Sequence, residues 1–376
     1  MFGHVPPPLV PLETVEALRY SISDLFTVYD TTLDQPAPGQ VRFRGQFLRD
    51  PANCYDELRA RFERFGFTPL VRREEDRIAL IALPVIFNPA PSRWWINLVL
   101  FLATIWTTLY TGALYESGEL ISFFDLGSLV KGIPFSLSLM LILGAHELGH
   151  YFAARYHKVP VTLPYFIPVP GSFSLIGTLG AFIQLKAPVK NRRALFDVGV
   201  AGPLAGLVFA IPILFYGLST SAVGPLPVNT PYVAEGNSIL YMLMKIAVFG
   251  RVLPGGGLDV QLNQVAWAGW VGLLVTGLNL IPVGQLDGGH VAYVLFGKRA
   301  RQFFWPVLIG LGVLVVLTGT TMWLIWILLL YFMGRNHAEP LDDVTELDSR
   351  RRALAYFMLV LFVLVFVPVP LRFVNL

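Results

Sequence analysis

The clearest chemical signal in this 376-residue sequence is a group of ionisable residues within one helical turn of each other. They are His146, Glu147 and His150, in the motif His-Glu-Leu-Gly-His, inside an apolar stretch. On a helix, residues four apart lie on one face, so the two histidines can direct two imidazoles to one metal ion with Glu147 beside them. This pattern is typical of zinc hydrolases, in which the glutamate is the general base and not a ligand.

An alternative is that these side chains are only polar groups that neighbouring helices satisfy, without a metal. Burying three ionisable groups in a membrane helix costs several kcal/mol unless they are paired or ligated. Intramembrane ionisable residues are therefore functional by default, and a metal site is favoured.

A third metal ligand is expected elsewhere in the chain, because zinc hydrolases use three protein ligands and leave a fourth position for water. Asp287 and His290 follow an apolar stretch that is interrupted by Pro282. A carboxylate and an imidazole both suit zinc. The residue types favour Asp287 and leave His290 as its rival, while an ordinary turn at Asp287-Gly288-Gly289 is a further alternative.

The composition places these motifs in a membrane protein. Hydrophobic residues make up 55% of the chain and charged residues only 14%, whereas soluble domains carry roughly a quarter charged residues. The formal net charge of +3 is too small to indicate nucleic-acid binding. Cys54 is the single cysteine, which excludes an internal disulfide. We therefore expect a polytopic α-helical membrane protein in a lipid bilayer.

Several apolar stretches have about the length needed to cross the hydrocarbon layer. The seven predicted spans are residues 94–115, 134–157, 194–217, 264–286, 303–318, 320–334 and 353–371. The stretches 303–318 and 320–334 are short for two spans and long for one, so the count can shift by one. Residues 237–250 are too short to cross comfortably and are predicted to form an interfacial or half-inserted helix.

Residues 1–93 contain no stretch that could cross a membrane and are predicted to form a small soluble α+β domain. A strand at 41–48, a helix that begins after Asp50 and a strand pair within 68–87 give a β-α-β-β unit. The transmembrane domain that carries the metal motifs is then expected at 94–376.

Basic residues gather in alternate loops between the apolar stretches. They are Lys186, Lys190, Arg192 and Arg193 in one loop, Lys298, Arg299 and Arg301 in another, and Arg335 with Arg350, Arg351 and Arg352 in a third. Such loops stay on the cytoplasmic side. The start of the chain shows no pattern of a removable targeting segment. We therefore expect a multi-pass integral protein of a bacterial cell membrane, with its N-terminal domain in the cytoplasm.

Residues 159–185 are apolar but carry four prolines followed by several glycines, which prevents a regular helix. Irregular backbone at membrane depth must be buried in protein or line a cavity, so a re-entrant β-like loop is predicted. An exposed strand edge could hold an unwound substrate segment by β-addition, and residues 177–184 are the candidate. The alternative is that their glycines only permit a turn and close packing.

Two motifs together resemble those of the site-2 proteases, intramembrane zinc metalloproteases that cleave membrane-anchored proteins within or near the bilayer. They are His146-Glu147-x-x-His150 and Asn279-x-x-Pro282-x-x-x-x-Asp287-Gly288. The resemblance covers about residues 134–295, the motif-bearing core. Within this range, it includes the segments Leu163–Pro168, Gly177–Gln184 and Ala201–Gly206. The chain is most similar to the subgroup without a PDZ domain, which includes chloroplast-type members.

This resemblance implies a site of one Zn²⁺ per chain, with His146, His150 and Asp287 as ligands. It places Asn279 near the reacting carbonyl, as a possible oxyanion donor, although Asn279 could instead satisfy backbone freed by Pro282. The implied partners are transmembrane or membrane-anchored protein substrates, cleaved in regulated intramembrane proteolysis. The resemblance also favours substrate binding by a short segment. Its residues are Gly177, Thr178, Leu179, Gly180, Ala181 and Phe182.

A metal transporter and an inactive scaffold protein are the alternatives to a protease. A metal transporter needs several intramembrane sites along a pathway, whereas the acidic residues and histidines here collect at one place. A catalytically inactive scaffold is disfavoured because the ligands and the base are all present. His157 lies two turns after His150, and it is predicted to be an interfacial residue and not a ligand.

Overall fold

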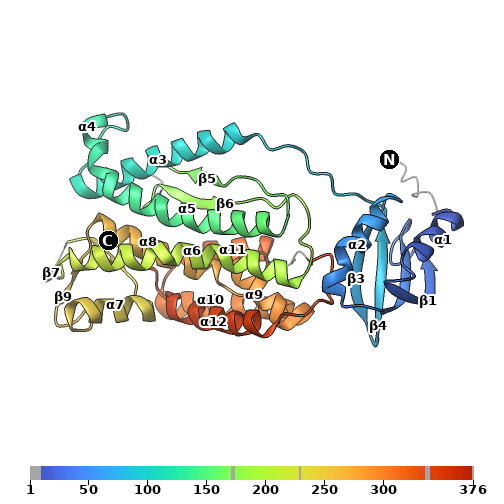
Figure 1. Cartoon of the computed structure of the whole chain (residues 1–376). Coiled ribbons are helices and arrows are strands. Elements are labelled where there is room, and N and C mark those ends of the chain that lie inside the picture. Colours follow the sequence, from blue (N-terminus) through green and yellow to red (C-terminus); the bar gives the residue numbers. More distant parts are fainter. Residues whose placement is uncertain (1–9, 171–173, 228–229, 335–338, 375–376) are drawn as a thin grey trace, which may run out of the picture. The chain divides into compact units, whose positions relative to one another are not determined.

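The computed structural model describes residues 10–170, 174–227, 230–334 and 339–374 (Figure 1). Three parts of the predictions lie outside these residues: the start of the soluble domain, Gly171 to Phe173 of the re-entrant loop, and Arg335 of a basic loop. The chain divides into two compact units, and each is described by itself. Within the described residues, the first unit contains 10–91, 186–195 and 339–348, and the second contains the rest.

The first unit is built on a four-stranded antiparallel sheet with the strand order β1-β2-β4-β3. Its elements are α1 (Leu12–Ser21), β1 (Phe26–Leu33), β2 (Val41–Phe47), α2 (Pro51–Glu63), β3 (Thr68–Glu74) and β4 (Arg77–Leu83). The start of α2 follows from its sequence, because Pro51 suits the first helical turn and Asp50 accepts a hydrogen bond from the Ala52 nitrogen at 3.0 Å.

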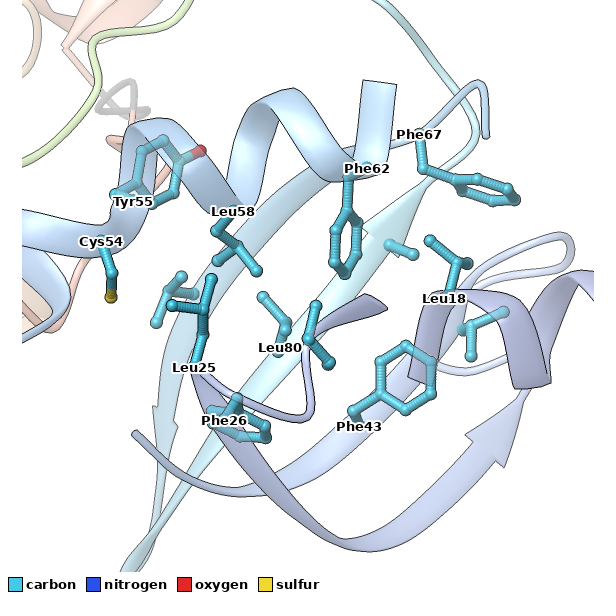
Figure 2. Packing of buried hydrophobic residues seen from close by; sticks show 14 of the residues in the cluster. Leu18, Leu25, Phe26, Phe43, Cys54, Tyr55, Leu58, Phe62, Phe67 and Leu80 are labelled. Atoms are coloured by element: carbon cyan, nitrogen blue, oxygen red, sulfur yellow. The ribbon is translucent and has the colours of Figure 1, made fainter. Parts of the chain in front are cut away.

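The helices and the sheet of this unit enclose one hydrophobic core (Figure 2). Leu18 of α1, Phe43 of β2 and Phe62 of α2 are completely buried in it. Full burial of such a side chain stabilises a fold by about 1.5–3 kcal/mol. Tyr55 is also buried, and its hydroxyl donates a hydrogen bond to the Pro69 oxygen at 2.8 Å. The core therefore contains no unpaired hydroxyl at this position.

The predicted β-α-β-β unit lacked α1 and β1, which the structure adds before it. A helix of 10 residues is marginal in isolation, and α1 is held by the burial of Val15 and Leu18. In β1, a register shift between Val28 and Asp30 interrupts the alternation that identifies a strand. Both elements depend on tertiary contacts, which explains why the local pattern did not reveal them.

Two later segments complete the first unit, although the predicted boundary at residue 93 excluded them. The Val71 nitrogen donates to the Leu341 oxygen at 2.8 Å, and the Leu341 nitrogen donates to the Val189 oxygen at 2.9 Å. Arg192 and Asp343 also form an ion pair at 2.8 Å. Backbone pairing between distant segments leaves no periodic pattern of side chains, so the sequence did not indicate it.

The second unit is mainly helical and holds the predicted motifs. Its helices are α3 (Trp94–Ser117), α4 (Leu126–Leu129), α5 (Ile133–Tyr156), α6 (Arg192–Ser219), α7 (Ile239–Phe249), α8 (Gln264–Asn279), α9 (Asp287–Phe296), α10 (Phe304–Thr318), α11 (Met322–Met333) and α12 (Ser349–Val365), with 3-10 turns η1 (Val130–Gly132) and η2 (Gly297–Phe303). The first few residues of α6 belong to the first unit. Helix α5 packs against α3 and α8.

Within the described residues, four helical segments are long and apolar enough to cross a membrane. They are Trp94–Ser117, Leu126–Tyr156, Arg192–Ser219 and Asp287–Thr318. The first three agree with the predicted spans 94–115, 134–157 and 194–217. The last one differs, because α9, η2 and α10 form a continuous helical segment where a loop and a shorter span were expected.

The predicted count of seven spans is not reproduced by these helices. The predicted span 264–286 ends as a helix at Asn279, and α8 has only 16 residues. Helices α11 and α12 have 12 and 17 residues, fewer than the roughly 20 that a perpendicular span requires. A hydropathy window sums apolar residues on both sides of a turn, which explains the longer prediction for 264–286.

Short strand pairs complete the second unit. They are β5 (Tyr165–Pro168) with β6 (Thr178–Phe182), β7 (Ala222–Pro225) with β9 (Leu258–Gln261), and β8 (Tyr232–Glu235) with β10 (Leu371–Val374), all antiparallel. The β5–β6 pair lies within the stretch for which a β-like loop was predicted. In Figure 1 it runs alongside α3 and α5, and both helices contact β6.

Candidate metal centre

Three predicted ligand residues come together from α5 and α9. His146 and His150 lie one turn apart on α5, and Asp287 is the first residue of α9. The Nε2 atoms of the histidines are 3.2 Å apart. Each lies 3.3 Å from a different oxygen of Asp287, His146 from Oδ2 and His150 from Oδ1. The histidines are buried, and the Asp287 side chain is only 13% exposed.

These separations fit a zinc ion better than they fit direct hydrogen bonds. Nitrogen and oxygen ligands bind tetrahedral zinc at about 2.0–2.2 Å, which places any two ligand atoms about 3.3–3.6 Å apart. Charge-assisted hydrogen bonds between nitrogen and oxygen are shorter, at about 2.7–2.9 Å. Two imidazoles and one carboxylate are also a common ligand set of catalytic zinc. Both the separations between the three side chains and their ligand types therefore fit a zinc site.

The structure distinguishes Asp287 from its rival His290. Among the described residues, the group that could hold a metal ion consists of His146, His150 and Asp287. His290 lies one turn further along α9, where its Cβ faces the backbone of Gly199 on α6. The turn between α8 and α9 thus brings the carboxylate to the histidines and directs the imidazole of His290 toward another helix.

Helix α6 supports the two histidines through contacts that the sequence reasoning did not identify. The Nδ1 atom of His150 lies 2.7 Å from the Val198 oxygen, which leaves Nε2 for the metal. A Cβ atom on Gly202 would lie 2.1 Å from Nε2 of His150, and one on Gly206 would lie 3.3 Å from Cβ of His146. The small residues of the motif Ala201–Gly206 therefore leave room for the two histidines.

Glu147 and Asn279 lie beside this group. Glu147 is buried on α5 between the two histidines, and its carboxylate interacts with the backbone of Ile183, the residue after β6. Asn279 ends α8, and its Nδ2 atom lies 3.4 Å from Nε2 of His146. A carboxylate and an amide thus lie next to the grouped side chains.

The residues predicted to bind substrate form β6 and the turn before it. Within the described chain, β6 pairs with β5 alone, so its second edge carries no strand. Leu179 and Phe182 are exposed, whereas Thr178 is buried and donates to the Ile167 oxygen at 2.8 Å. Gly180 has a φ of +95°, which explains its glycine independently of any substrate.

His157 does not join the metal group. Its Nε2 atom lies 2.8 Å from Oδ2 of Asp197 on α6, and the same carboxylate accepts hydrogen bonds from Arg351 of α12 at 2.7 and 2.8 Å. This cluster connects the ends of three helices. The prediction that His157 is not a ligand agrees with this geometry, but its partner Asp197 was not anticipated.

Comparison with known proteins decides the family. Residues 134–318 match the model of Peptidase family M50, and this range includes both motifs and all of the grouped residues. The chain therefore contains a domain of Peptidase family M50, the site-2 protease family. The predicted family is thereby confirmed. The M50 match and the four long apolar helices are consistent with a polytopic membrane protein.

The M50 relatives are plant proteins. The chain is 29% identical to the probable zinc metalloprotease EGY2, chloroplastic, of Arabidopsis thaliana, over 97% of this chain and 66% of the relative. It is 28% identical to EGY2 of Oryza sativa subsp. indica, over 97% and 68%. It is 32% identical to EGY1 of Arabidopsis thaliana, over 76% and 55%. The chain thus spans about two thirds of the length of EGY2 and about half that of EGY1.

These names support the predictions of a metalloprotease and of zinc as its metal, and they agree with the resemblance to chloroplast-type members. They contradict the prediction of a bacterial cell membrane. The relatives are named chloroplastic, which points to a chloroplast membrane. Apolar stretches and basic loops indicate that a chain enters a bilayer, but they do not identify which membrane it enters. This explains why the prediction of a bacterial cell membrane was wrong.

Proposed function

We propose that this chain is an intramembrane zinc protease that hydrolyses peptide bonds of transmembrane or membrane-anchored proteins in regulated intramembrane proteolysis. The observation that carries this proposal is the buried group of His146, His150 and Asp287, with Glu147 on the same helix and Asn279 next to it. The M50 relatives, which are named zinc metalloproteases, support the same activity. One Zn²⁺ per chain follows from the single ligand group among the described residues.

The grouped residues divide the chemistry of hydrolysis between them. Zinc held by the two histidines and Asp287 would lower the pKa of a bound water and polarise the scissile carbonyl. Glu147 accepts the proton of the attacking water and passes it to the nitrogen of the leaving amine as the C–N bond breaks. Nδ2 of Asn279 donates a hydrogen bond to the carbonyl oxygen as negative charge develops there. One water is consumed for each bond that is cut.

The free edge of β6 is the proposed holder of the substrate. A transmembrane substrate presents carbonyls that are already engaged within a helix, so a segment must unwind before it is cut. An unwound segment can add to an exposed strand edge through backbone hydrogen bonds. The contact between Glu147 and Ile183 brings the proposed base to the end of β6. Residues Gly177 to Phe182 would then bind substrate, and the β5–β6 pair would lie at membrane depth as a re-entrant element.

The substitution Glu147→Gln tests the proposal. It removes the base and keeps the ligands, so cleavage of a single-span membrane protein in reconstituted vesicles should fall by about 10²–10⁴-fold. Zinc content, measured by mass spectrometry of the metal, should stay near that of the native chain. Glu119→Gln is a matched control, because Glu119 is exposed in a loop of the same unit.

The same pair of measurements separates the other functional classes. Full cleavage by the Glu147→Gln chain would contradict the proposal. A transporter or an inactive scaffold predicts that metal transport or client binding survives this substitution and that neither chain cuts the vesicle-embedded protein.

A further inference from the structure

The second unit contains a cavity that the proposed chemistry does not use. Its volume is about 350 Å³, within the range of small-ligand pockets. Its lining includes aromatic and apolar residues and two carboxylates, among them Tyr115, Trp267, Leu262, Val233, Glu235 and Asp259. Tyr115 stacks on Trp267 with ring planes 9° apart, which gives the wall a rigid aromatic part.

Two carboxylates and one ammonium group meet at this cavity. Nζ of the completely buried Lys245 lies 3.0 Å from Oε1 of Glu235 and 3.2 Å from Oδ1 of Asp259. It also lies 4.5 Å from the ring centre of Tyr241. With both acids ionised, the three groups carry one excess negative charge. Arg372 lines a neighbouring cavity, but among the described residues it forms no ion pair with either acid.

Each carboxylate keeps one oxygen without a protein partner. Glu235 uses Oε1 for Lys245 and for the Tyr241 hydroxyl at 2.9 Å, and Asp259 uses Oδ1 for Lys245 and for the Val260 nitrogen at 2.8 Å. Within the described residues, Oε2 and Oδ2 receive no hydrogen bond. The Glu235 side chain is only 8% exposed. Both carboxylates line the cavity, so these two oxygens can accept a hydrogen bond from a donor that enters it.

The residues that line the cavity favour an organic cation, that is, an ammonium or guanidinium group on an apolar chain. Unpaired carboxylate oxygens attract an ammonium or guanidinium group, and aromatic faces stabilise the same groups by cation–π interaction. Apolar residues such as Val233 and Leu262 suit the methylene stem of a lysine or arginine side chain. An anion would meet the excess negative charge at the base of the cavity.

The cavity lies at the start of the proposed substrate strand. Leu175, three residues before β6, is exposed and lines the cavity. The backbone of Gly177 lies against Thr107 and Thr111 of α3, one turn before Tyr115. At the other end of β6, Ile183 contacts Glu147. Leu175 and Ile183 are eight positions apart in the sequence, so a fully extended path between them covers at most about 26 Å.

We propose that this cavity is a subsite for a lysine or arginine side chain of the substrate, about eight residues from the bond that is cut. This inference rests on the proposed function, because it uses β6 as the strand that aligns the substrate. A substrate segment paired with β6 would have its reacting bond beside Glu147 and its basic residue between Trp267 and Glu235. The cavity would thus recognise a positive charge of the substrate far from the cut bond.

Binding of two short peptides to the full chain in detergent tests the cavity independently of cleavage. The probes are the fluorescent, end-blocked peptides Ala-Ala-Lys-Ala-Ala and Ala-Ala-Gln-Ala-Ala. The lysine peptide should bind at least about tenfold more tightly, and its advantage should shrink with added salt. Equal affinity for the two peptides would overturn the assignment.

Two variants locate the binding and avoid the buried lysine cluster. Val233 is exposed on β8 and lines the cavity, so Val233→Lys should place a competing ammonium there and abolish the preference for the lysine peptide. Val252→Lys is the matched control, since Val252 is also exposed and lies outside the cavity lining. An unchanged preference in Val233→Lys would show that the peptide binds elsewhere.

A cleavage measurement then separates this inference from the proposed function. In a cleaved single-span protein, changing a lysine eight residues from the cut bond to glutamine should raise KM about tenfold and leave kcat unchanged. An unchanged KM would overturn the role in substrate selection. Lysine-selective peptide binding by a chain that cuts no membrane protein would support the cavity and overturn the proposed function.

Discussion

Nδ1 of His150 lies 2.7 Å from the backbone oxygen of Val198. The proton of the neutral imidazole is held at Nδ1 by this contact, so Nε2 is left as the lone-pair donor that a metal requires. Helix α6 therefore sets the orientation of a ligand that belongs to α5. Changes on α6 should reach the metal without altering any ligand.

Gly202→Ala should lower zinc affinity by about 10–100-fold, as is usual when the support of a metal ligand is disturbed. The added Cβ would lie 2.1 Å from Nε2 of His150, so the imidazole must move. Zinc titration of the metal-free chain measures the effect. Gly310→Ala on α10 is the control, because a Cβ there meets nothing within 4 Å, and it should bind zinc like the native chain.

Asp287→Ala should reduce zinc content from about one ion per chain to a small fraction of that value, because one of three protein ligands is lost. His290→Ala should retain the metal, since His290 faces Gly199 and not the ligand group. Metal analysis after dialysis against a weak chelator distinguishes the two. The opposite result would make His290 the ligand.

Asn279→Leu should lower kcat by about 10²–10³-fold, the usual cost of losing one donor to a developing oxyanion. Zinc content should not change, because Asn279 lies 3.4 Å from His146 and is not one of the grouped ligands. If Asn279 only satisfies backbone at the end of α8, the thermal midpoint should drop while kcat stays near its native value.

Cys54 should report on the opening of the first unit, because it is the single cysteine of the chain and is buried in the core. Burial raises the pKa of its thiol, so the native chain should react slowly with an alkylating reagent at pH 8. This raised pKa stabilises the fold below the thiol's ordinary pKa. The contribution is lost as pH rises through the raised value.

Phe62→Ala should speed this labelling by about a hundredfold or more, because deleting a buried phenylalanine costs about 3–5 kcal/mol. Mass spectrometry of the labelled chain gives the rate. Phe65→Ala is the matched control, since Phe65 is exposed in the turn that follows the same helix and should change the rate little. Equal acceleration by both variants would contradict the core assignment.

The helices and strands of the first unit show which elements a local sequence pattern can predict. The helix after Asp50 and the strand pair that follows were predicted, because a capping residue and a polar turn between two apolar runs are local signals. Helix α1, strand β1 and the pairing of Val71 with Leu341 were not, because each depends on a partner elsewhere in the chain. The predicted span 264–286 was too long for a different reason, because hydropathy sums apolar residues on both sides of the turn between α8 and α9.

The sequence by itself determined the family and the chemistry of the site. Helical spacing places His146, Glu147 and His150 on one turn whatever the rest of the chain does, and apolar composition places that turn in a membrane protein. Only the tertiary structure shows that Asp287, and not His290, lies with the two histidines. Both are compatible with zinc, and the choice depends on how α9 leaves the turn after Asn279.

The tertiary structure also decided what surrounds the site. The Val198 carbonyl contacts His150 through a backbone atom, and Gly202 leaves space for the same imidazole because it has no side chain. The residue types alone do not show that either residue lies next to His150. The cavity beside Glu235 and Asp259 joins α3, α8 and three short strands, so no single stretch of sequence contains it. Local spacing is a property of one helix, whereas a supporting carbonyl or a cavity exists only after distant segments pack together.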